Sequence, residues 1–325
     1  MIPLVSVLTP SWNRASYLHK VWEGLEAQGF RNFEWIVAND GSVDKTVEVV
    51  RELAQKSDFP ITLISASQRV GKSRIDNEAV SVARGEFIIW CDSDDVLLPE
   101  ALQTLFETWL SIPEKERDSF CGISALCDTE YGVLGNQFYN SRAPIDVIWN
   151  EMYRALRADL VIFTRADLVK QNPFLEVDFL ISESSVWSKI GVLKTRFLPV
   201  VLERKSYGEI NALSYSGHMS YNRGHAHAIA VTNPYTTPFI NRKERLQRAI
   251  NFLRYCRHGD ISWREALQLW GAAGRDTLLL LSLLPIAEAL ALKDQLQGKV
   301  RKTHRDFLTA QAVATITTER LTNGK

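Results

Sequence analysis

The stretch that decides the fold is Phe87-Ile88-Ile89-Trp90-Cys91-Asp92-Ser93-Asp94-Asp95-Val96-Leu97-Leu98-Pro99. A short apolar run bounded by turn signals predicts a buried strand, and Pro99 suits the first position of a following helix. The three aspartates would then lie at the carboxyl end of a strand. Open α/β sheets bind their ligands at that edge.

Three carboxylates within four residues repel one another unless a cation or hydrogen-bond donors compensate their charge. Hard divalent ions such as Mg²⁺ or Mn²⁺ take oxygen ligands and are often held by one or two carboxylates plus substrate phosphates. Asp92, Asp94 and Asp95 are therefore candidate metal ligands. The alternative is a solvated acidic loop that caps the next helix.

The chain has 325 residues, of which 46% are hydrophobic and 23% charged, so we expect an ordinary globular protein of one large or two smaller domains. Its formal net charge is zero, which argues against nucleic acid as a general partner. Four cysteines without metal-ligand spacing predict free thiols. We find no signal peptide and no apolar run long enough to span a membrane, so we expect a cytoplasmic protein.

Strand and helix patterns alternate through the first hundred residues, which predicts right-handed crossovers and a mostly parallel sheet. The expected strands cover residues 4–9, 33–38, 61–65 and 87–90, and the expected helices cover residues 17–28, 45–56 and 73–83. Polar loops follow three of the strands, at residues 9–14, 39–44 and 92–95. Because parallel strands end at the same edge, these loops should meet in the geometry of a nucleotide site.

The second half of the chain is less regular. We expect a hairpin over residues 119–140, a helix over 145–156, a strand over 160–164, a short helix over 183–190 and a strand over 197–203. From residue 238 onward the pattern is helical and basic. We therefore expect an α/β domain over residues 1–237, with a nucleotide-binding half (1–100) and an acceptor half (101–237), and a helical extension over 238–325.

Four motifs resemble those of the family-2 glycosyltransferases. Residues 5–14 (VSVLTPSWNR) are similar to the family's opening strand and loop, and residues 39–44 (NDGSVD) to its Asp-Asp-Gly-Ser-x-Asp turn. Residues 71–77 (GKSRIDN) resemble its Gly-x-x-x-x-x-Asn segment, and residues 92–95 (DSDD) its Asp-x-Asp. The resemblance implies the GT-A fold, a Rossmann-like, mostly parallel sheet flanked by helices.

The resemblance also implies roles for single residues on the donor side. Asp40 would accept hydrogen bonds from a uracil base, and Pro10 and Asn13 would shape the loop over the nucleotide. Arg74 would pair with a phosphate, although a surface arginine on a helix is an equal alternative. Asn39 stands where many relatives have Asp.

For the acidic loop, the resemblance implies that Asp92 contacts ribose or metal-bound water and that Asp94 ligates Mn²⁺ or Mg²⁺, with Asp95 as the next candidate. The cation would neutralise the departing diphosphate.

On the acceptor side, residues 181–190 resemble the segment that carries the family's general base. Glu183 is the candidate, Asp178 is the reserve, and Ser184 replaces the second acid of the family pair. The segment 215–223 stands where relatives close a loop over the donor phosphates, which makes His218 and Arg223 candidate phosphate contacts.

The sequence thus predicts an inverting, metal-dependent transferase that moves a sugar from a nucleotide-sugar, expected to be a UDP-sugar, to a hydroxyl of a glycan or lipid-linked acceptor. One alternative is a nucleotide-sugar-binding protein without turnover, because of Ser184. Another is a phosphatase of the haloacid-dehalogenase type, because of residues 92–96. Residues 278–305, apolar and then basic, suit peripheral contact with the inner face of a membrane, packing on the catalytic domain, or a homo-oligomer interface.

Overall fold

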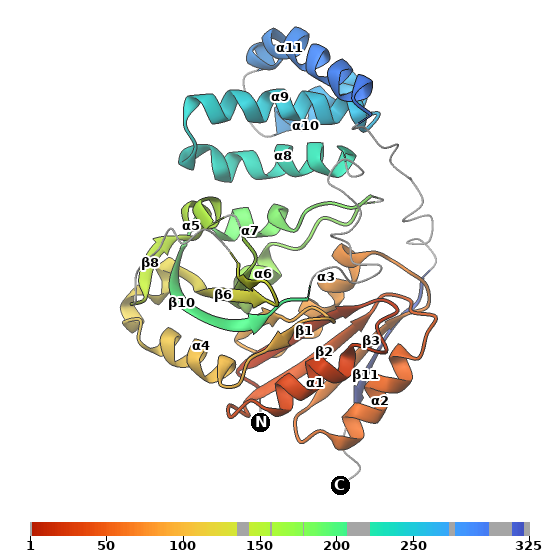
Figure 1. Ribbon diagram of the computed structural model, residues 1–325, viewed down its shortest axis with the longest axis vertical. Helices are drawn as coiled ribbons and strands as arrows, with labels where there is room; N and C mark the ends of the chain where they lie inside the picture. The colour runs from red at the N-terminus through yellow and green to blue at the C-terminus, as the bar shows by residue number, and fades with distance from the viewer. Residues whose placement is uncertain are drawn as a thin grey trace. The chain divides into compact units, whose positions relative to one another are not determined.

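The structure of the chain is a computed structural model that describes residues 2–134, 143–156, 158–177, 179–206, 222–272, 277–298 and 314–321 (Figure 1). The chain forms two compact units. The first comprises residues 1–174, 190–207 and 310–325, and the second comprises residues 175–189 and 208–309. This grouping differs from the expected division after residue 237, because both units draw on separate stretches of sequence.

The first unit is built on one mixed sheet. Its strand order is β11-β3-β2-β1-β4-β9-β6-β10-β5, with β7 and β8 paired outside this path. The strands are β1 (Val5–Ser11), β2 (Phe33–Asn39), β3 (Ile61–Ala66), β4 (Phe87–Trp90), β5 (Val96–Leu97), β6 (Phe120–Thr129), β7 (Gly132–Val133), β8 (Ile145–Ile148), β9 (Leu160–Arg165), β10 (Lys194–Arg204) and β11 (Ile316–Leu321). β3, β2, β1 and β4 run parallel, as predicted.

Helices connect these parallel strands. α1 (Leu18–Glu26) and α2 (Thr46–Lys56) lie side by side over β1, β2 and β3 (Figure 1). The third crossover, through α3 (Lys72–Val82), returns past β1 to β4. Because such crossovers are right-handed, this reversal places α3 on the opposite face of the sheet. The remaining helices of the unit are α4 (Ala101–Leu110), α5 (Trp149–Leu156), α6 (Ala166–Gln171) and the 3₁₀ segment Glu114–Ser119.

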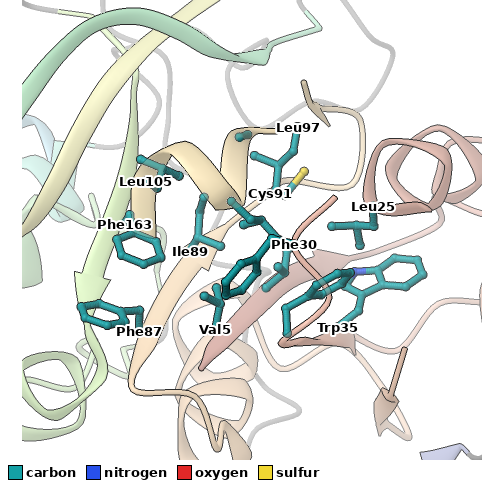
Figure 2. Packing of buried hydrophobic residues seen from close by; sticks show 14 of the residues in the cluster. Val5, Leu25, Phe30, Trp35, Phe87, Ile89, Cys91, Leu97, Leu105 and Phe163 are labelled. Atoms are coloured by element: carbon teal, nitrogen blue, oxygen red, sulfur yellow. The ribbon is translucent and has the colours of Figure 1, made fainter. Parts of the chain in front are cut away.

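The core of the first unit lies between the sheet and the helices packed on it. Phe87, at the start of β4, is fully buried, with its ring stacked on Phe163 at a centroid distance of 4.6 Å and edge-on to Trp109 at 5.0 Å. Figure 2 shows this cluster, which includes Val5, Leu25, Phe30, Trp35, Ile89, Cys91, Leu97 and Leu105. The four cysteines are free and buried, as predicted.

The second unit is helical in its described part. α7 (Ser184–Ile190) begins in its first stretch, followed by α8 (Asn222–Thr236), α9 (Arg242–His258), α10 (Trp263–Ala272) and α11 (Thr277–Leu296), with a 3₁₀ turn at Thr237–Phe239. Asn241 and Glu244 form a capping box at the start of α9. No helix in the described ranges has the length and apolar character needed to cross a bilayer.

Two predictions of secondary structure are wrong. Residues 145–148 form β8, which pairs antiparallel with β10, and only then does α5 begin. Residues 316–321 form β11 in the region expected to be helical. Both segments are rich in β-branched residues, Ile145-Asp146-Val147-Ile148 and Ile316-Thr317-Thr318, which fit a sheet surface better than a helix.

We predict that Phe87→Ala lowers the free energy of unfolding by about 3–5 kcal/mol, the usual cost of truncating a fully buried phenylalanine. Urea unfolding followed by circular dichroism measures this loss. Val43→Ala is the matched control, because Val43 is 91% exposed and its truncation should change stability by less than about 0.5 kcal/mol. A loss below about 1 kcal/mol for Phe87→Ala would contradict the packing described here.

Candidate active site

The carboxyl ends of β1, β2 and β4 come together at one edge of the sheet, as predicted. β1 continues through Pro10 to Ser11, beyond the point where β4 stops at Trp90. On the β4 side of β1, the Leu8 carbonyl is the last acceptor, bonded by the Cys91 amide at 3.0 Å. The next donor toward β4 would be the amide of Pro10, which proline lacks. The Thr9 hydroxyl donates to the Cys91 carbonyl instead, at 2.8 Å, so this carbonyl has a partner.

Asn13 ties the loop after β1 to the loop after β2. Its backbone amide donates to the Ser42 hydroxyl at 2.8 Å, and its side-chain oxygen accepts the Val43 amide at 2.9 Å. Asn13 has a φ of 54°, a left-handed conformation that asparagine tolerates better than most residues. Asn13 therefore links the loops after β1 and β2, and its place over a nucleotide stays a prediction.

Asp40 holds the loop that follows β3. Its carboxylate accepts the amides of Val70 at 2.6 Å and Gly71 at 3.0 Å, and Arg69 Nε lies 3.6 Å from Oδ2. The neighbouring Gly41 has a φ of 66°, and a Cβ at that position would lie 2.3 Å from the Gln68 carbonyl carbon. Only glycine fits so close to this backbone.

An aromatic ring and a cation lie next to Asp40. The guanidinium carbon of Arg69 lies 3.8 Å from the centroid of the Trp12 ring, close enough for a cation–π contact. Burial raises the pKa of Asp40, although the Val70 and Gly71 amides and Arg69 oppose this shift. The loops after β1, β2 and β3 thus form one connected surface at Trp12, Asp40 and Arg69.

Asp95 is the most constrained carboxylate of the acidic loop. Its Oδ2 lies 2.6 Å from Lys205 Nζ, and its Oδ1 accepts the Ser206 amide at 3.0 Å. Its own amide donates to the Asp92 carbonyl at 3.0 Å, which closes the turn. Because both carboxyl oxygens already have protein partners, Asp95 is the least available of the three predicted metal ligands.

Asp92 and Asp94 are more available. The Asp92 side chain is 44% exposed and lies between two ammonium groups, Lys72 at 3.9 Å and Lys205 at 3.8 Å. Asp94 Oδ2 lies 3.5 Å from Arg14. Asp92 therefore faces both solvent and two basic side chains.

Lys205 lies among three carboxylates, since Glu203 is 3.5 Å from its Nζ in addition to Asp92 and Asp95. Glu203 is 1% exposed, and its Oε1 has no hydrogen-bond partner among the described residues. Its Oε2 accepts the Cys127 thiol at 3.5 Å. One buried cation is thus shared by more negative charge than it can balance.

The pKa values reflect this crowding. Burial raises the pKa of Asp95 to about 8; Lys205 opposes this shift, and Glu203 and Asp92 add to it. Burial likewise raises the pKa values of Asp94 and Glu203. Asp92 differs: burial raises its pKa, but Lys72 and Lys205 together lower it below the ordinary value. Asp92 is the carboxylate that stays ionised most readily.

Lys72 has its own buried carboxylate. Its Nζ lies 2.9 Å from Asp76 Oδ2, one helical turn along α3, and Asp76 is 1% exposed. Asp76 Oδ1 also accepts the Trp90 indole N–H at 3.4 Å. Sequence reasoning missed Lys72, Lys205 and Glu203. For Lys72 a signal existed, because an i,i+4 Lys–Asp pair lies inside the Gly71–Asn77 motif.

Of the other predicted site residues, Arg74, Glu183 and Arg223 lie in the described part of the chain. Arg74 pairs with Glu78 at 2.8 Å on the exposed side of α3. Glu183 and Arg223 belong to the second unit. Arg223 forms an ion pair with Glu265, and its guanidinium lies over the Phe179 ring. The carbonyl of Glu183, just before α7, accepts the Val186 amide at 2.9 Å. Asp178 and His218 lie outside the described residues.

The donor set can be tested against a divalent ion. Among the described residues, no cluster of three or more acidic, histidine or cysteine side chains has the geometry of a complete metal site. Mg²⁺, however, usually takes only one or two protein carboxylates and completes its shell with water and phosphate. Asp92 fits that role because its side chain is 44% exposed and its pKa is lowered, so that it stays ionised, and Asp94 lies in the same loop.

The family model "Glycosyl transferase family 2" matches residues 6–131, which contain β1 to β6 and the acidic loop. This chain carries a family 2 glycosyltransferase domain. The glycosyltransferase GlyG of Streptococcus pneumoniae is 28% identical over 55% of this chain and 60% of its own length. A β-1,3-glucosyltransferase of Campylobacter jejuni that acts on GalNAc(5)-diNAcBac-PP-undecaprenol is 34% identical over 33% of this chain and 34% of its own length.

Solved structures with a similar fold align with more of the chain than the family model does. S. aureus TarS 1-349, solved with UDP-GlcNAc, aligns with a TM-score of 0.57 at 14% identity over 90% of this chain and 92% of its own. The mannosyltransferase PcManGT of Pyrobaculum calidifontis, solved with GDP-Man and Mn²⁺, gives 0.52 at 20% identity over 96% and 87%. The predicted GT-A fold is confirmed. By sequence, the chain spans less than two thirds of the length of the two relatives above.

We predict that Lys205→Met destabilises the protein by about 3–5 kcal/mol near pH 8, because it leaves buried carboxylates without their cation. The loss should be smaller at pH 5, where those carboxyls take up protons. In the folded parent the pKa of Asp95 is about 8, whereas the pKa of an aspartate in the unfolded chain is near 3.8. Asp95 therefore stabilises the fold at low pH, and this contribution declines as the pH rises through 8.

Urea unfolding at pH 5 and pH 8 measures both effects, with Lys56→Met as the control because Lys56 is exposed on α2. Equal losses for Lys205→Met at the two pH values would contradict this account of the acidic cluster.

Proposed function

We propose that this chain transfers a sugar from a nucleotide-sugar to a hydroxyl group of a glycan or lipid-linked acceptor. The observation that carries the proposal is the meeting of three polar loops, after β1, β2 and β4, around an acidic cluster in which the Asp92 side chain is 44% exposed. Asn13, Asp40 and Asp94 come from these three loops. A family 2 domain with this edge has the parts to bind a nucleoside at one side and a diphosphate at the other.

UDP is the proposed nucleotide. Asp40 occupies the position whose family counterpart binds uracil, and it lies beside Arg69 and Trp12, although both of its oxygens already accept backbone amides. TarS, which shares the fold, was solved with UDP-GlcNAc, whereas PcManGT was solved with GDP-Man. The fold thus accommodates either base, and the choice of UDP rests on Asp40.

A divalent ion, Mn²⁺ or Mg²⁺, is proposed at Asp94 and Asp92. The exposed, ionised carboxylate of Asp92 supports this assignment, because it can supply an oxygen ligand to such an ion. When bound, such an ion supplies positive charge to the diphosphate of the donor. Lys205 and Ser206 bond to the carboxylate of Asp95. In this proposal Asp95 therefore fixes the loop, and Asp92 and Asp94 face the ligand.

Glu183 is the proposed general base, and the proposed transfer inverts the anomeric configuration. Glu183 removes the proton of the acceptor hydroxyl, the hydroxyl oxygen bonds to the anomeric carbon, and the bond from that carbon to the diphosphate oxygen breaks. The nucleoside diphosphate leaves with the electron pair of that bond. Ser184, in place of a second acid, keeps the alternative of a binding protein without turnover open for the experiment below.

Cellular location and partners stay predictions. We propose a cytoplasmic protein, with the inner face of the membrane as the place of a lipid-linked acceptor. Several apolar side chains of α11 are exposed, among them Leu278 at 75%, Leu292 at 57% and Leu296 at 80%. They suit either a membrane surface or a second copy of the chain; of the basic residues expected beside them, Lys293 is exposed on α11, and those from Lys299 to Arg305 lie outside the described part.

We predict that UDP at a hundred times its dissociation constant stabilises the protein by about 2.7 kcal/mol, and that EDTA abolishes this effect. A thermal-shift panel of UDP, GDP, dTDP and CMP, each with Mn²⁺, Mg²⁺ or EDTA, measures it. Asp94→Asn should remove the metal-dependent part because it removes a proposed ligand. No shift with any nucleotide on folded protein would refute the proposed donor site.

We predict that Glu183→Gln lowers the transfer rate by about 10²- to 10⁴-fold, the usual contribution of a general base, while UDP binding stays unchanged. The rate is measured as the amount of sugar transferred per unit time from a UDP-sugar to glycan or lipid-linked acceptors in an extract. Glu176→Gln is the control, since Glu176 is exposed in the same stretch. If the parent binds UDP but transfers no sugar from any UDP-sugar, the chain is a binding protein instead.

A further inference from the structure

The last described strand of the chain, β11, completes the sheet beside the first three strands. β11 pairs antiparallel with β3 over six residue pairs, from Ile316 with Ala66 to Leu321 with Ile61. Arg51 of α2 adds a two-pronged hydrogen bond to the carboxylate of Glu319. This strand lies far outside the matched family segment, residues 6–131.

The pairing continues past the end of β3 into the loop that Asp40 holds. The Ser67 amide donates to the Thr315 carbonyl at 2.9 Å, and the Thr315 amide donates to the Ser67 hydroxyl at 3.0 Å. Ser67 is the first residue after β3. Its two bonds reach a residue 248 positions away in sequence, so this end of the loop is fixed by the C-terminal segment.

The remaining residues of the loop, 67–71, are fixed by the donor side of the site. Gln68 lies against the Gly41 turn, Arg69 lies over the Trp12 ring, and the Val70 and Gly71 amides bond to Asp40. The loop is therefore held at one end by Thr315 and at the other by Asp40. Release of the Thr315 end would give the backbone beyond Ser67 more conformations, which have to be lost again when a ligand binds.

We propose that β11 is a positioning element for nucleotide binding, with Thr315 and Ser67 as the residues that transmit its effect to the loop 67–71. The inference rests on the proposed function for its ligand, a nucleoside diphosphate. It adds that affinity for this ligand depends on residues 315–321. The contacts of these residues described above are with β3, with Ser67 just after β3, and with Arg51 of α2. The structural part, that β11 orders the loop, is testable without any ligand.

The register supplies a matched pair of variants. Ser67 and Thr315 are directly opposite and hydrogen-bonded, and hydrogen-bonded pairs alternate along antiparallel strands. The amides of Thr317 and Glu319 therefore point at β3, whereas those of Thr318 and Arg320 point away from it. Thr317→Pro with Glu319→Pro removes ladder bonds, and Thr318→Pro with Arg320→Pro places the same two prolines where no ladder donor is lost.

The experiment uses the full chain and two readouts, amide hydrogen exchange of Val70 and Gly71 without ligand, and UDP affinity by calorimetry with Mn²⁺ present. For Thr317→Pro/Glu319→Pro we expect exchange at Val70 and Gly71 to quicken and UDP affinity to fall, each by about tenfold, within the range typical of coupled sites. Amides of β1 and β2, such as Leu8 and Ile36, should stay protected. The Thr318→Pro/Arg320→Pro control should resemble the parent in both readouts.

A milder pair of variants covers the case in which the prolines unfold the protein. Ser67→Ala removes the acceptor of the Thr315 amide, while Ser65→Ala removes a hydroxyl that has no hydrogen-bond partner among the described residues. Faster exchange at Val70 and Gly71 in Ser67→Ala alone supports the inference.

Unchanged exchange and affinity in both Ser67→Ala and Thr317→Pro/Glu319→Pro overturn the inference and leave the proposed function intact. If the parent binds no UDP, the proposed function fails, and exchange at Val70 and Gly71 alone then decides whether β11 orders the loop.

Discussion

The burial of β1 between β2 and β4 is the constraint on which the rest of the structure depends. Val5, Val7 and Leu8 are completely buried, so both faces of the strand need cover, and parallel neighbours need helical crossovers to supply it. The first two crossovers run outward to β3, and the third returns past β1 to β4. This reversal is a topological switch point, where loops separate and a ligand finds space. The acidic loop follows β4 at that point.

A cluster of carboxylates at the switch point is stable only with compensation, and the fold supplies it from distant strands. Lys205 comes from just beyond β10 and lies 2.6 Å from Asp95, 110 residues earlier in the chain. β10 reaches the loop because Glu203 pairs with Leu97 of β5. The compensation is partial, since one buried oxygen of Glu203 has no hydrogen-bond partner among the described residues. Asp92, at 44% exposed, is the carboxylate of this loop that stays open to solvent.

The parts of the fold and of the candidate site that could be predicted are those whose sequence pattern lies within a short stretch of the chain. The alternation of apolar runs and helical periods fixes β1 to β4 within short windows, and the polar residues at their ends stand next to them in sequence. Asn13, Asp40 and Asp94 could therefore be named as candidates from the sequence alone. Lys205 and Glu203 act through contacts across about a hundred residues or more, and a single lysine in a strand pattern carries no sign of its partner. β11 was missed because a strand of six residues that follows a long helical region is too short to stand out, and its pairing partner, β3, is distant in sequence.

These distant contacts also limit what the family segment can do alone. Residues 6–131 contain the acidic loop, but Lys205 and Ser206, which hold Asp95, lie outside this segment. Thr315, which bonds to the loop beside Asp40, lies outside it as well. Without them, Asp95 would be a buried carboxylate with no cation, and β3 would be an open sheet edge. The motifs that identify the family therefore name the candidate residues, while the later sequence determines the geometry in which those residues are presented.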